Sequence, residues 1–298
     1  MVIVGPTASG KSDLAVKLAK KFSGEVISAD SRQVYRGLDI GSGKITKAEM
    51  EGIPHYLLDV ASPKRVFTVS HYQKLAQEKV KGIWERNKLP IICGGTGLYI
   101  RAAVDGITFP EVPPNLKLRK SLEKKSVIEL FRILNQLDPA RAKTIDAKNP
   151  RRLIRAIEIA TVLQQVPRLV AHPIADNKQI LFIGLKPDDD ILKKKIKTRL
   201  LNRLKAKGKK NLITEVKNLK KSGLSWQRLE ALGLEYRYVA LFLQNKLTLE
   251  QMKTELNQAI WHYAKRQMTW FKADKRIKWF EKSADLWKDG GVASFLGD

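Results

Sequence analysis

The sequence is poor in cysteine, in long apolar runs and in acidic residues. The single cysteine, Cys93, among 298 residues excludes an internal disulfide framework and a cysteine-rich metal site. No apolar run approaches the roughly 20 residues that a membrane-spanning helix needs. The first residues run directly into an apolar strand pattern, so we expect no signal peptide, no membrane association and a cytoplasmic protein.

The shortage of acidic residues leaves a large positive charge. Against 56 Lys and Arg stand 30 Asp and Glu, which gives a formal net charge of +26. Residues 1–105 hold 16 basic and 10 acidic side chains, and the remainder holds 40 and 20. This asymmetry favours a polyanionic partner, nucleic acid before membrane. A lysine-rich, solubilising surface is the alternative.

The strongest motif is at the start of the chain. An apolar run, Met1-Val-Ile-Val4, is followed by Gly5-x-x-x-x-Gly10-Lys11-Ser12 and then by a helical pattern. This is the phosphate-binding loop in its strand–loop–helix context, and a chance glycine-rich turn is the alternative. Backbone N–H groups, the helix N-terminus and Lys11 would bind a di- or triphosphate, and the Ser12 hydroxyl would ligate Mg²⁺. The predicted diphosphate-binding residues are Gly5, Pro6, Thr7, Ala8, Ser9, Gly10, Lys11 and Ser12.

A second buried-strand pattern, residues 24–30, ends in Asp30. Ligands of open α/β sheets lie beyond the carboxyl ends of the strands, so we expect Asp30 at the same edge as the phosphate loop. A turn-forming role is the alternative for Asp30. A third strand, residues 88–93, leads into Gly94-Gly-Thr-Gly-Leu-Tyr99, where glycine serves either close approach of a ligand or tight chain reversal. For His55, a lone histidine in an apolar setting, we favour a structural role.

The pattern changes after residue 107, at a proline-rich break over residues 109–114. Residues 116–137 are strongly helical in pattern, with a capping box at Ser126-x-x-Glu129, and a further helix starts at Asn149-Pro150. We therefore predict a first part of a phosphate-loop core at 1–107, a mainly helical insertion at 108–175, and core completion with a basic helical part at 176–298.

Three downstream segments concentrate basic residues. Arg151, Arg152 and Arg155 cluster at the start of a helix, where a bound anion or solvated charge explains them equally well. Residues 186–221 hold 14 Lys and Arg against 4 Asp and Glu, including Arg199, Arg203 and a lysine cluster at 205–210. The pattern is amphipathic, with an apolar face expected at Ile191, Ile196, Leu200, Leu204, Ile213 and Val216. Residues 263–271 interleave basic and aromatic side chains, which suits RNA, although core aromatics on a basic helix fit as well. From this segment we predict tRNA contacts by Lys265, Arg266 and Gln267.

Together the motifs resemble the tRNA dimethylallyltransferase (tRNA isopentenyltransferase) family over nearly the whole chain. The resemblance rests on five motifs in the family's order and approximate spacing: Gly5–Ser12, Asp30–Gly37, Gly94–Tyr99, Asn149–Ala156 and Ala264–Trp270. It implies an α/β fold, with a P-loop NTPase-like core of parallel sheet flanked by helices and a mainly helical insertion domain that grips tRNA. The implied enzyme is a prenyltransferase, of the 2.5.1 class, that moves a dimethylallyl group from dimethylallyl diphosphate to N6 of adenosine 37 in tRNA.

The resemblance also implies roles for single residues. The catalytic set becomes Asp30, Thr7 and Arg199, with Asp30 as the base and Arg199 as a cationic clamp. The implied tRNA contacts are Asp30, Ser31, Arg32, Gln33, Thr96, Arg119, Arg151, Arg152, Leu153, Ile154, Arg155, Gly233, Leu234, Glu235, Tyr236, Arg237 and Tyr238. The turn at Gly233–Tyr238 departs from the family, because many members have a Gly-Tyr pair followed by an acidic residue there. The expected partners are the anticodon stem-loop and dimethylallyl diphosphate, the expected cofactor is Mg²⁺ at Ser12, and we expect a monomer.

Two other readings of the motifs remain. A small-molecule or nucleotide kinase has the same core, but it leaves the downstream charge unexplained. An RNA-binding module with a vestigial phosphate loop explains the charge, but the intact Lys11, Ser12 and Asp30 argue against it.

Overall fold

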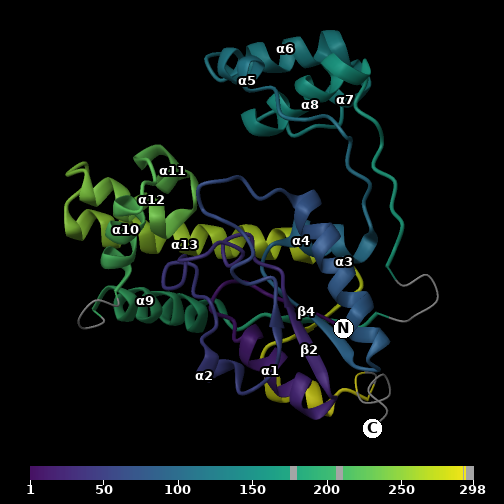
Figure 1. Cartoon of the computed structure of the whole chain (residues 1–298), viewed down its shortest axis with the longest axis vertical. Coiled ribbons are helices and arrows are strands. Elements are labelled where there is room, and N and C mark those ends of the chain that lie inside the picture. The colour runs from purple at the N-terminus through teal and green to yellow at the C-terminus, as the bar shows by residue number, and fades with distance from the viewer. Residues whose placement is uncertain (175–179, 206–210, 291, 293–298) are drawn as a thin grey trace. The chain divides into compact units, whose positions relative to one another are not determined.

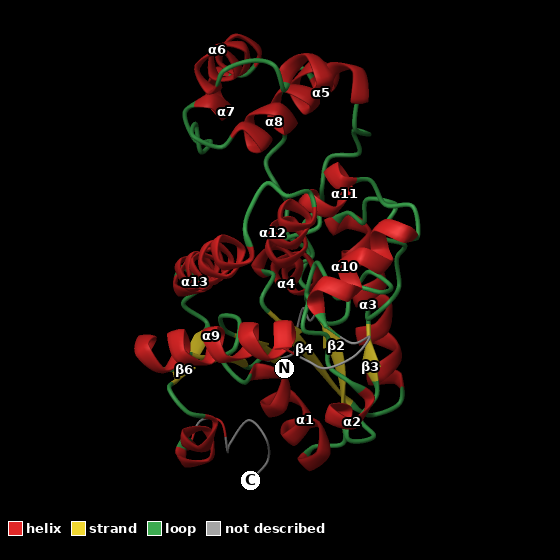
Figure 2. Ribbon diagram, turned by 90° about the vertical axis from the view of Figure 1, so that its left-hand side faces the viewer, coloured by secondary structure: helices red, strands yellow, loops and turns green. Residues whose placement is uncertain are grey.

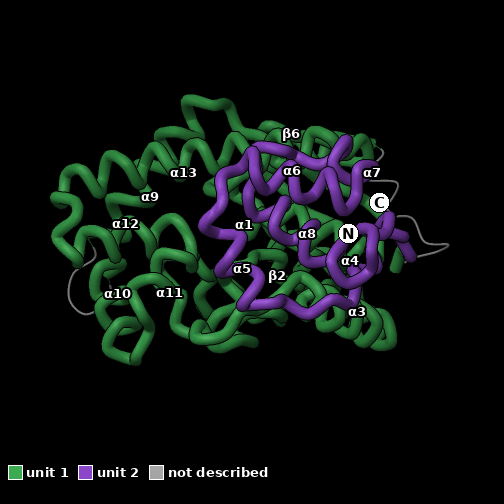
Figure 3. The backbone as a smooth tube through the Cα atoms, turned by 90° about the horizontal axis from the view of Figure 1, so that it is seen from above, with its two compact units in different colours: residues 1–106, 173–298 green, residues 107–172 purple. Residues whose placement is uncertain are grey.

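The computed structural model describes residues 1–174, 180–205, 211–290 and 292, and Figure 1 shows the course of the chain. These residues form two compact units, one of residues 1–106 and 173–298 and one of residues 107–172 (Figure 3). The first unit therefore has its chain interrupted by the second. None of the described helices is long and apolar enough to cross a membrane.

The described strands of the first unit form one sheet in which every pairing is parallel. The strand order is β3-β2-β4-β1-β5-β6. The strands are β1 (Val2–Val4), β2 (Gly24–Ser28), β3 (His55–Tyr56), β4 (Leu89–Gly94), β5 (Phe182–Leu185) and β6 (Ile277–Phe280). The carboxyl ends of all six lie at one edge, where the fold class places ligands.

Helices cover both faces of this sheet (Figure 2). Successive side chains of β1 point to opposite faces of the sheet, and both faces are apolar. Val2 and Val4 belong to one apolar core and Ile3 to the other, so each face needs a covering layer of helices. The helices of the first unit are α1 (Lys11–Lys21), α2 (Lys47–Met50), α3 (Val69–Glu85), α4 (Gly97–Asp105), α9 (Asp189–Lys205), α10 (Leu212–Lys221), α11 (Trp226–Ala231), α12 (Leu234–Leu243), α13 (Leu249–Lys272) and the 3₁₀ helix η1 (Ser283–Lys288). The core with Ile3 includes α1 and η1, and the other includes α3, α4 and α9 to α13.

The second unit is helical, with α5 (Leu116–Leu122), α6 (Val127–Leu137), α7 (Pro139–Ala142) and α8 (Pro150–Leu163). The helical pattern over residues 116–137 is two helices, because the Ser126 and Glu129 capping box starts a new one. Leu130, Leu134 and Leu153 are buried in its core. The two ends of the unit meet in an antiparallel bridge between Ile107 and Ala171.

The basic segment after β5 differs in detail from its predicted pattern. Ile191 was expected on the apolar face of the helix but is 44% exposed, and Leu192 is buried instead. Ile196 and Leu200 are buried as the pattern predicts. The lysine cluster at 205–210 falls, except for Lys205 at the end of α9, outside the described residues.

Candidate active site at the carboxyl edge of the sheet

The phosphate loop joins β1 to α1 through an unusual backbone. Gly5 (φ 153°) and Gly10 (φ 91°) have positive φ, and so does Ala8 (φ 63°). A Cβ on Gly5 would lie 2.7 Å from the carbonyl oxygen of Leu185, so the loop packs directly against the end of β5. Gly10 is the N-cap of α1 and brings no side-chain acceptor to the first turn. The N–H groups of that turn are therefore available to an anion.

Two side chains of the loop lack the partner that an anion would supply. The Lys11 Nζ donates to the Pro6 carbonyl oxygen at 3.2 Å. The pKa of Lys11 is lowered overall, mainly by burial and also by Arg199, while Cys93 and Asp30 oppose the shift. The Ser9 Oγ is buried and has no hydrogen-bond partner within the described ranges. A phosphate oxygen would neutralise the ammonium group and satisfy the hydroxyl.

Asp30 follows the end of β2 and stands at the same edge. Its Oδ1 accepts from the backbone N–H groups of Arg32 (2.8 Å) and Gln33 (3.3 Å), which is the turn-forming role. Its Oδ2 has no hydrogen-bond partner in the part of the chain that the structure describes. The backbone N–H of Ser31 donates to Thr96 Oγ1 at 3.0 Å, which ties this turn to the start of α4. One carboxylate oxygen therefore holds the turn and the other is left for chemistry.

Two arginines of α9 pack on the loop that follows this turn. Arg199 Nη2 donates to the Gly43 carbonyl oxygen at 3.3 Å, and Arg203 Nη1 donates to that of Gly41 at 3.2 Å. The side-chain amide of Gln33 donates to the same Gly43 oxygen at 3.3 Å. Gly43 has φ 61°, and a Cβ there would lie 1.9 Å from both guanidinium groups. The positive φ disfavours a residue with a side chain here, and a Cβ would displace both guanidinium groups.

Glu235 of α12 completes this charged cluster. Its Oε1 lies 3.3 Å from Arg203 Nη1. Burial, together with the neighbouring Arg203, lowers the pKa of Arg199 to about 10, and Glu235 opposes this shift. Burial raises the pKa of Glu235, and the two arginines oppose the rise. The cluster is thus a half-buried cationic site with one carboxylate, and an anion bound there would favour the charged arginines.

Glu215 of α10 is a functional candidate that the sequence analysis missed. It accepts from three consecutive N–H groups, those of Asp39 (3.1 Å), Ile40 (2.7 Å) and Gly41 (3.0 Å). It also accepts from the Tyr236 hydroxyl at 2.8 Å. It therefore fixes the loop that the arginines contact. One signal was present, because Glu215 is the only acidic residue in the strongly basic segment 191–221.

The atypical turn at Gly233–Tyr238 forms the start of α12. Gly233 has φ 142°, and a Cβ there would lie 3.2 Å from Arg32 Nε. The Tyr236 hydroxyl, besides binding Glu215, accepts from the Ser42 N–H at 3.1 Å. Of the remaining members, Leu234 and Tyr238 are half-buried and Arg237 is exposed. The turn thus contributes to the positioning of the loop that bears Gly41 and Gly43.

The predicted contacts on α13 divide into two groups. Lys265 and Arg266 are exposed, with Lys265 Nζ 5.6 Å from the ring centre of Trp261 and the Arg266 guanidinium 5.9 Å from that of Tyr263. Gln267 is buried, and its amide binds the phosphate loop and Gly95. The side-chain amide is therefore engaged within the protein, and the contact of Gln267 with tRNA stays a prediction.

The second unit holds the predicted contacts of the helical insertion. Arg119 makes a two-bond pair with the buried Glu158, at 2.8 Å and 2.7 Å, and Arg155 donates to the Val112 carbonyl oxygen at 2.8 Å. Arg151 and Arg152 are exposed near the start of α8. The side chains of Leu153 and Ile154 lie in the core of the unit. These buried side chains support α8, and the contact of the two residues with tRNA stays a prediction.

Metal binding was expected at Ser12. Its side chain is exposed in the first turn of α1, beside the N–H groups of the loop. The described residues contain no group of three or more His, Cys, Asp or Glu side chains that would hold a metal ion by themselves. A serine hydroxyl could serve as one Mg²⁺ ligand beside the phosphate oxygens of a substrate, and Mg²⁺ at Ser12 stays a prediction.

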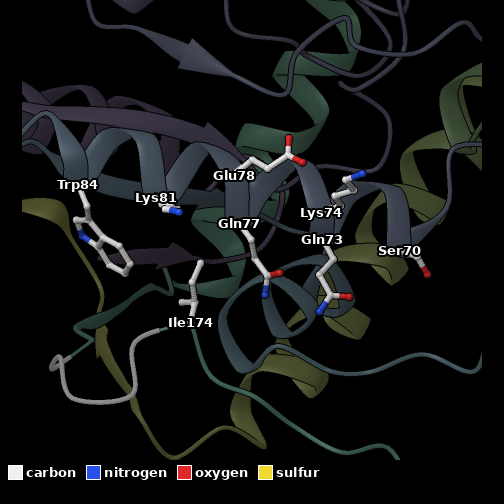
Figure 4. Close-up of a pocket in the computed structure, with 8 residues that line it drawn as sticks. All are labelled: Ser70, Gln73, Lys74, Gln77, Glu78, Lys81, Trp84 and Ile174. Atoms are coloured by element: carbon white, nitrogen blue, oxygen red, sulfur yellow. The ribbon is translucent and has the colours of Figure 1, made fainter.

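Two further features lie apart from these residues. His55, in β3, is half-buried with Nδ1 2.8 Å from the Ile53 carbonyl oxygen, and burial lowers its pKa, as for a structural histidine. A cavity of about 660 Å³ lies along α3 (Figure 4), where Gln73, Gln77 and Trp84 project on the side of Ile174. The cavity is lined by Ser70, Gln73, Lys74, Gln77, Glu78, Lys81, Trp84 and Ile174, none of which belongs to the site described above.

Comparisons with known proteins identify the family of this chain. The family model described as IPP transferase matches residues 33–274. The chain is 43% identical to tRNA dimethylallyltransferase 1 of Syntrophus aciditrophicus over 274 residues, which cover 90% of this chain and 88% of that protein. It is similar to the tRNA isopentenylpyrophosphate transferase of Bacillus halodurans (TM-score 0.72, 34% identity, 99% and 96% of the two chains). It is also similar to a eukaryotic dimethylallyltransferase acting on tRNA (TM-score 0.72, 25% identity, 90% and 68%). The chain, with a phosphate loop and Asp30 at one edge of a parallel sheet, belongs to the IPP transferase family.

Proposed function

We propose that this protein transfers the dimethylallyl group of dimethylallyl diphosphate to N6 of adenosine 37 in tRNA and releases diphosphate. The observation that carries the proposal is the meeting of the phosphate loop, Asp30 and Arg199 at the carboxyl edge of one sheet. The relatives are named tRNA dimethylallyltransferase. A diphosphate site and a base at one edge are what an alkyl transfer to a nitrogen requires.

The phosphate loop binds the diphosphate of the donor in this proposal. As the bond from C1 to the bridging oxygen breaks, negative charge grows on the leaving diphosphate. The N–H groups at the start of α1 and the Lys11 ammonium face that charge, and Arg199 adds a second cation from α9. When bound at Ser12, Mg²⁺ would neutralise part of the same charge.

Asp30 acts at the acceptor end. The N6 nitrogen of adenosine attacks C1, the C1–O bond breaks, and the N6 proton passes to Asp30 Oδ2. Oδ1 is occupied by the N–H groups of Arg32 and Gln33, which hold the carboxylate in place. The exocyclic amine is a weak nucleophile, so its position relative to C1 matters as much as the strength of the base. The adenine ring of adenosine 37 must leave its stack in the RNA to reach Asp30.

The tRNA binds through basic side chains in this proposal, of which Arg151, Arg152, Lys265 and Arg266 are exposed. Contacts of such basic side chains with the phosphates of the RNA would explain why the chain carries a formal net charge of +26. Thr7, Ser31, Arg32 and Thr96, around the Asp30 turn and the phosphate loop, surround the reacting base. Because one chain supplies both the base and the phosphate loop, we propose that the protein acts as a monomer, on tRNA in the cytoplasm.

A transfer assay with two donors and two acceptors tests the proposal. Labelled dimethylallyl diphosphate or labelled ATP is supplied with an anticodon stem-loop RNA that carries adenosine or guanosine at position 37. We expect label in the adenosine-bearing RNA from the prenyl donor alone. Label transferred from ATP to a small acceptor would show a kinase, and binding of RNA without any transfer would show a binding module.

A further inference from the structure

Gln267 joins two loops of the active edge through a single side-chain amide. Its Oε1 accepts from the backbone N–H of Thr7 at 2.9 Å, and its Nε2 donates to the Gly95 carbonyl oxygen at 2.8 Å. The residue is 7% exposed and lies on α13, 260 and 172 residues away from its two partners. Thr7 belongs to the phosphate loop after β1, and Gly95 follows β4, the strand next to β1.

The turn at Gly94–Thr96 is built around this amide. A Cβ on Gly95 would lie 2.2 Å from Gln267 Nε2, so any side chain there would displace the amide. A Cβ on Gly94 would lie 2.2 Å from the carbonyl oxygen of Ala29. Glycine is therefore required at position 94 because the backbone after the neighbouring strand β2 lies too close for a side chain. Neither glycine needs a ligand to explain it.

The same turn continues to the base. Thr96 Oγ1 accepts from the Ser31 N–H at 3.0 Å, and Ser31 is the neighbour of Asp30 in the chain. The Asp30 carboxylate is itself held by the N–H groups of its own turn. A continuous path of short bonds therefore runs from the phosphate loop through Gln267 and the Gly95–Thr96 turn to the Asp30 turn.

We propose that Gln267 is a positioning residue that sets the distance between the diphosphate cradle and Asp30, an inference that rests on the proposed function. An amide is needed because the site requires one acceptor and one donor in a fixed orientation. A glutamate in its place has no donor for Gly95 and adds a negative charge beside the diphosphate. A methionine fills the same space with neither bond.

The test compares kcat and the KM of each substrate in Gln267→Met, Gln267→Glu and a matched control. In Gln267→Met we expect kcat to fall on the order of 100-fold, with the KM for stem-loop RNA within about twofold, because reactants are misplaced while RNA contacts stay intact. In Gln267→Glu the KM for dimethylallyl diphosphate should rise further, by about tenfold or more, from charge repulsion.

The matched control is Gln251→Met. Gln251 is also a glutamine of α13 that accepts from a backbone N–H, that of Thr248, but it lies at the exposed start of the helix. We expect the control to keep kcat and both KM values.

A second variant changes Gly95, the residue whose carbonyl oxygen accepts from the Gln267 amide, and it tests the inference even if Gln267→Met fails to fold. Gly95→Ala pushes the amide away and should lower kcat to a similar extent, and the double variant with Gln267→Met should lose little more, because both changes break one linkage. A kcat within about threefold of the wild type in folded Gln267→Met, or fully additive losses in the double variant, would overturn the inference. A raised KM for RNA with kcat unchanged would overturn it in favour of tRNA contact. Absence of prenyl transfer by the wild type would instead refute the proposed function.

Discussion

Asp30 uses its two carboxylate oxygens differently, and a single substitution separates the two uses. Asp30→Asn keeps Oδ1 as an acceptor for Arg32 and Gln33 but removes the base. We expect transfer to fall by about 10²- to 10⁴-fold, with the Kd for stem-loop RNA nearly unchanged. Single-turnover transfer and filter binding measure the two quantities. Loss of RNA binding with the chemistry retained would assign Asp30 to tRNA recognition.

Glu215 supports the arginine site from a distance, and the chain offers a control for it. Glu215→Gln replaces one acceptor oxygen by a donor that faces backbone N–H groups or the Tyr236 hydroxyl, which costs about 1–3 kcal/mol of unfolding free energy. We expect the KM for dimethylallyl diphosphate to rise as well, because the loop that Arg199 and Arg203 contact is loosened.

Glu25→Gln is the matched control for that substitution. Glu25 also accepts from a tyrosine hydroxyl, that of Tyr56 at 2.8 Å, and pairs with Arg86 (2.6 Å) and Lys88 (2.7 Å). It lies near the amino end of β2, away from the active edge. We expect it to lower the Tm while leaving the KM unchanged. An equal rise in KM in both variants would attribute the effect to general destabilisation.

At the scale of elements, the second unit depends on a buried carboxylate between α5 and α8. Glu158 is 1% exposed and binds Arg119, Arg155 and the Asn115 N–H. Burial by itself would raise its pKa, but the hydrogen bonds of Arg119 and the Asn115 N–H outweigh burial and leave the pKa below its ordinary value of 4.5. The stabilisation is therefore complete above about pH 4.5 and is lost as the pH falls through the lowered folded-state pKa.

Acid titration of the full chain checks this dependence. Amide hydrogen exchange in α5 and α8 should accelerate as the pH is lowered below 4.5, after correction for the intrinsic exchange rate. Glu158→Gln should be less stable at neutral pH and should show a smaller change over the same range. An unchanged profile in Glu158→Gln would mean that another carboxylate of the unit controls its acid stability.

At the scale of the whole molecule, the charge of +26 predicts binding governed by salt. The logarithm of the affinity for stem-loop RNA should fall linearly with the logarithm of salt concentration, because phosphate contacts release counterions. Arg151→Gln and Lys265→Gln should each weaken binding and reduce the slope by about one. Arg86→Gln, at the amino edge of the sheet, should leave the slope unchanged. A slope insensitive to Arg151 and Lys265 would place the RNA on another surface.

Local patterns were sufficient for the parts of this protein that depend on neighbours in the chain. The strand–loop–helix order places the phosphate loop, the end of β2 places Asp30 at the shared edge, and Ser126 with Glu129 starts α6. Each follows from backbone geometry, strand direction or a cap within a few residues, which a sequence pattern carries directly. The family resemblance, which a known family model and relatives confirm, added the activity to that local picture.

Only the tertiary structure decided which polar side chains turn inward. Gln267 reads as a surface residue among basic and aromatic neighbours, yet its amide joins two loops 88 residues apart in sequence, at Thr7 and Gly95. Glu215 sits in a basic helix, and its carboxylate binds a loop 174–176 residues earlier. Such pairings depend on which face of a helix packs against the sheet and at what depth. That is set by the packing of the whole unit, and no short window of sequence contains it.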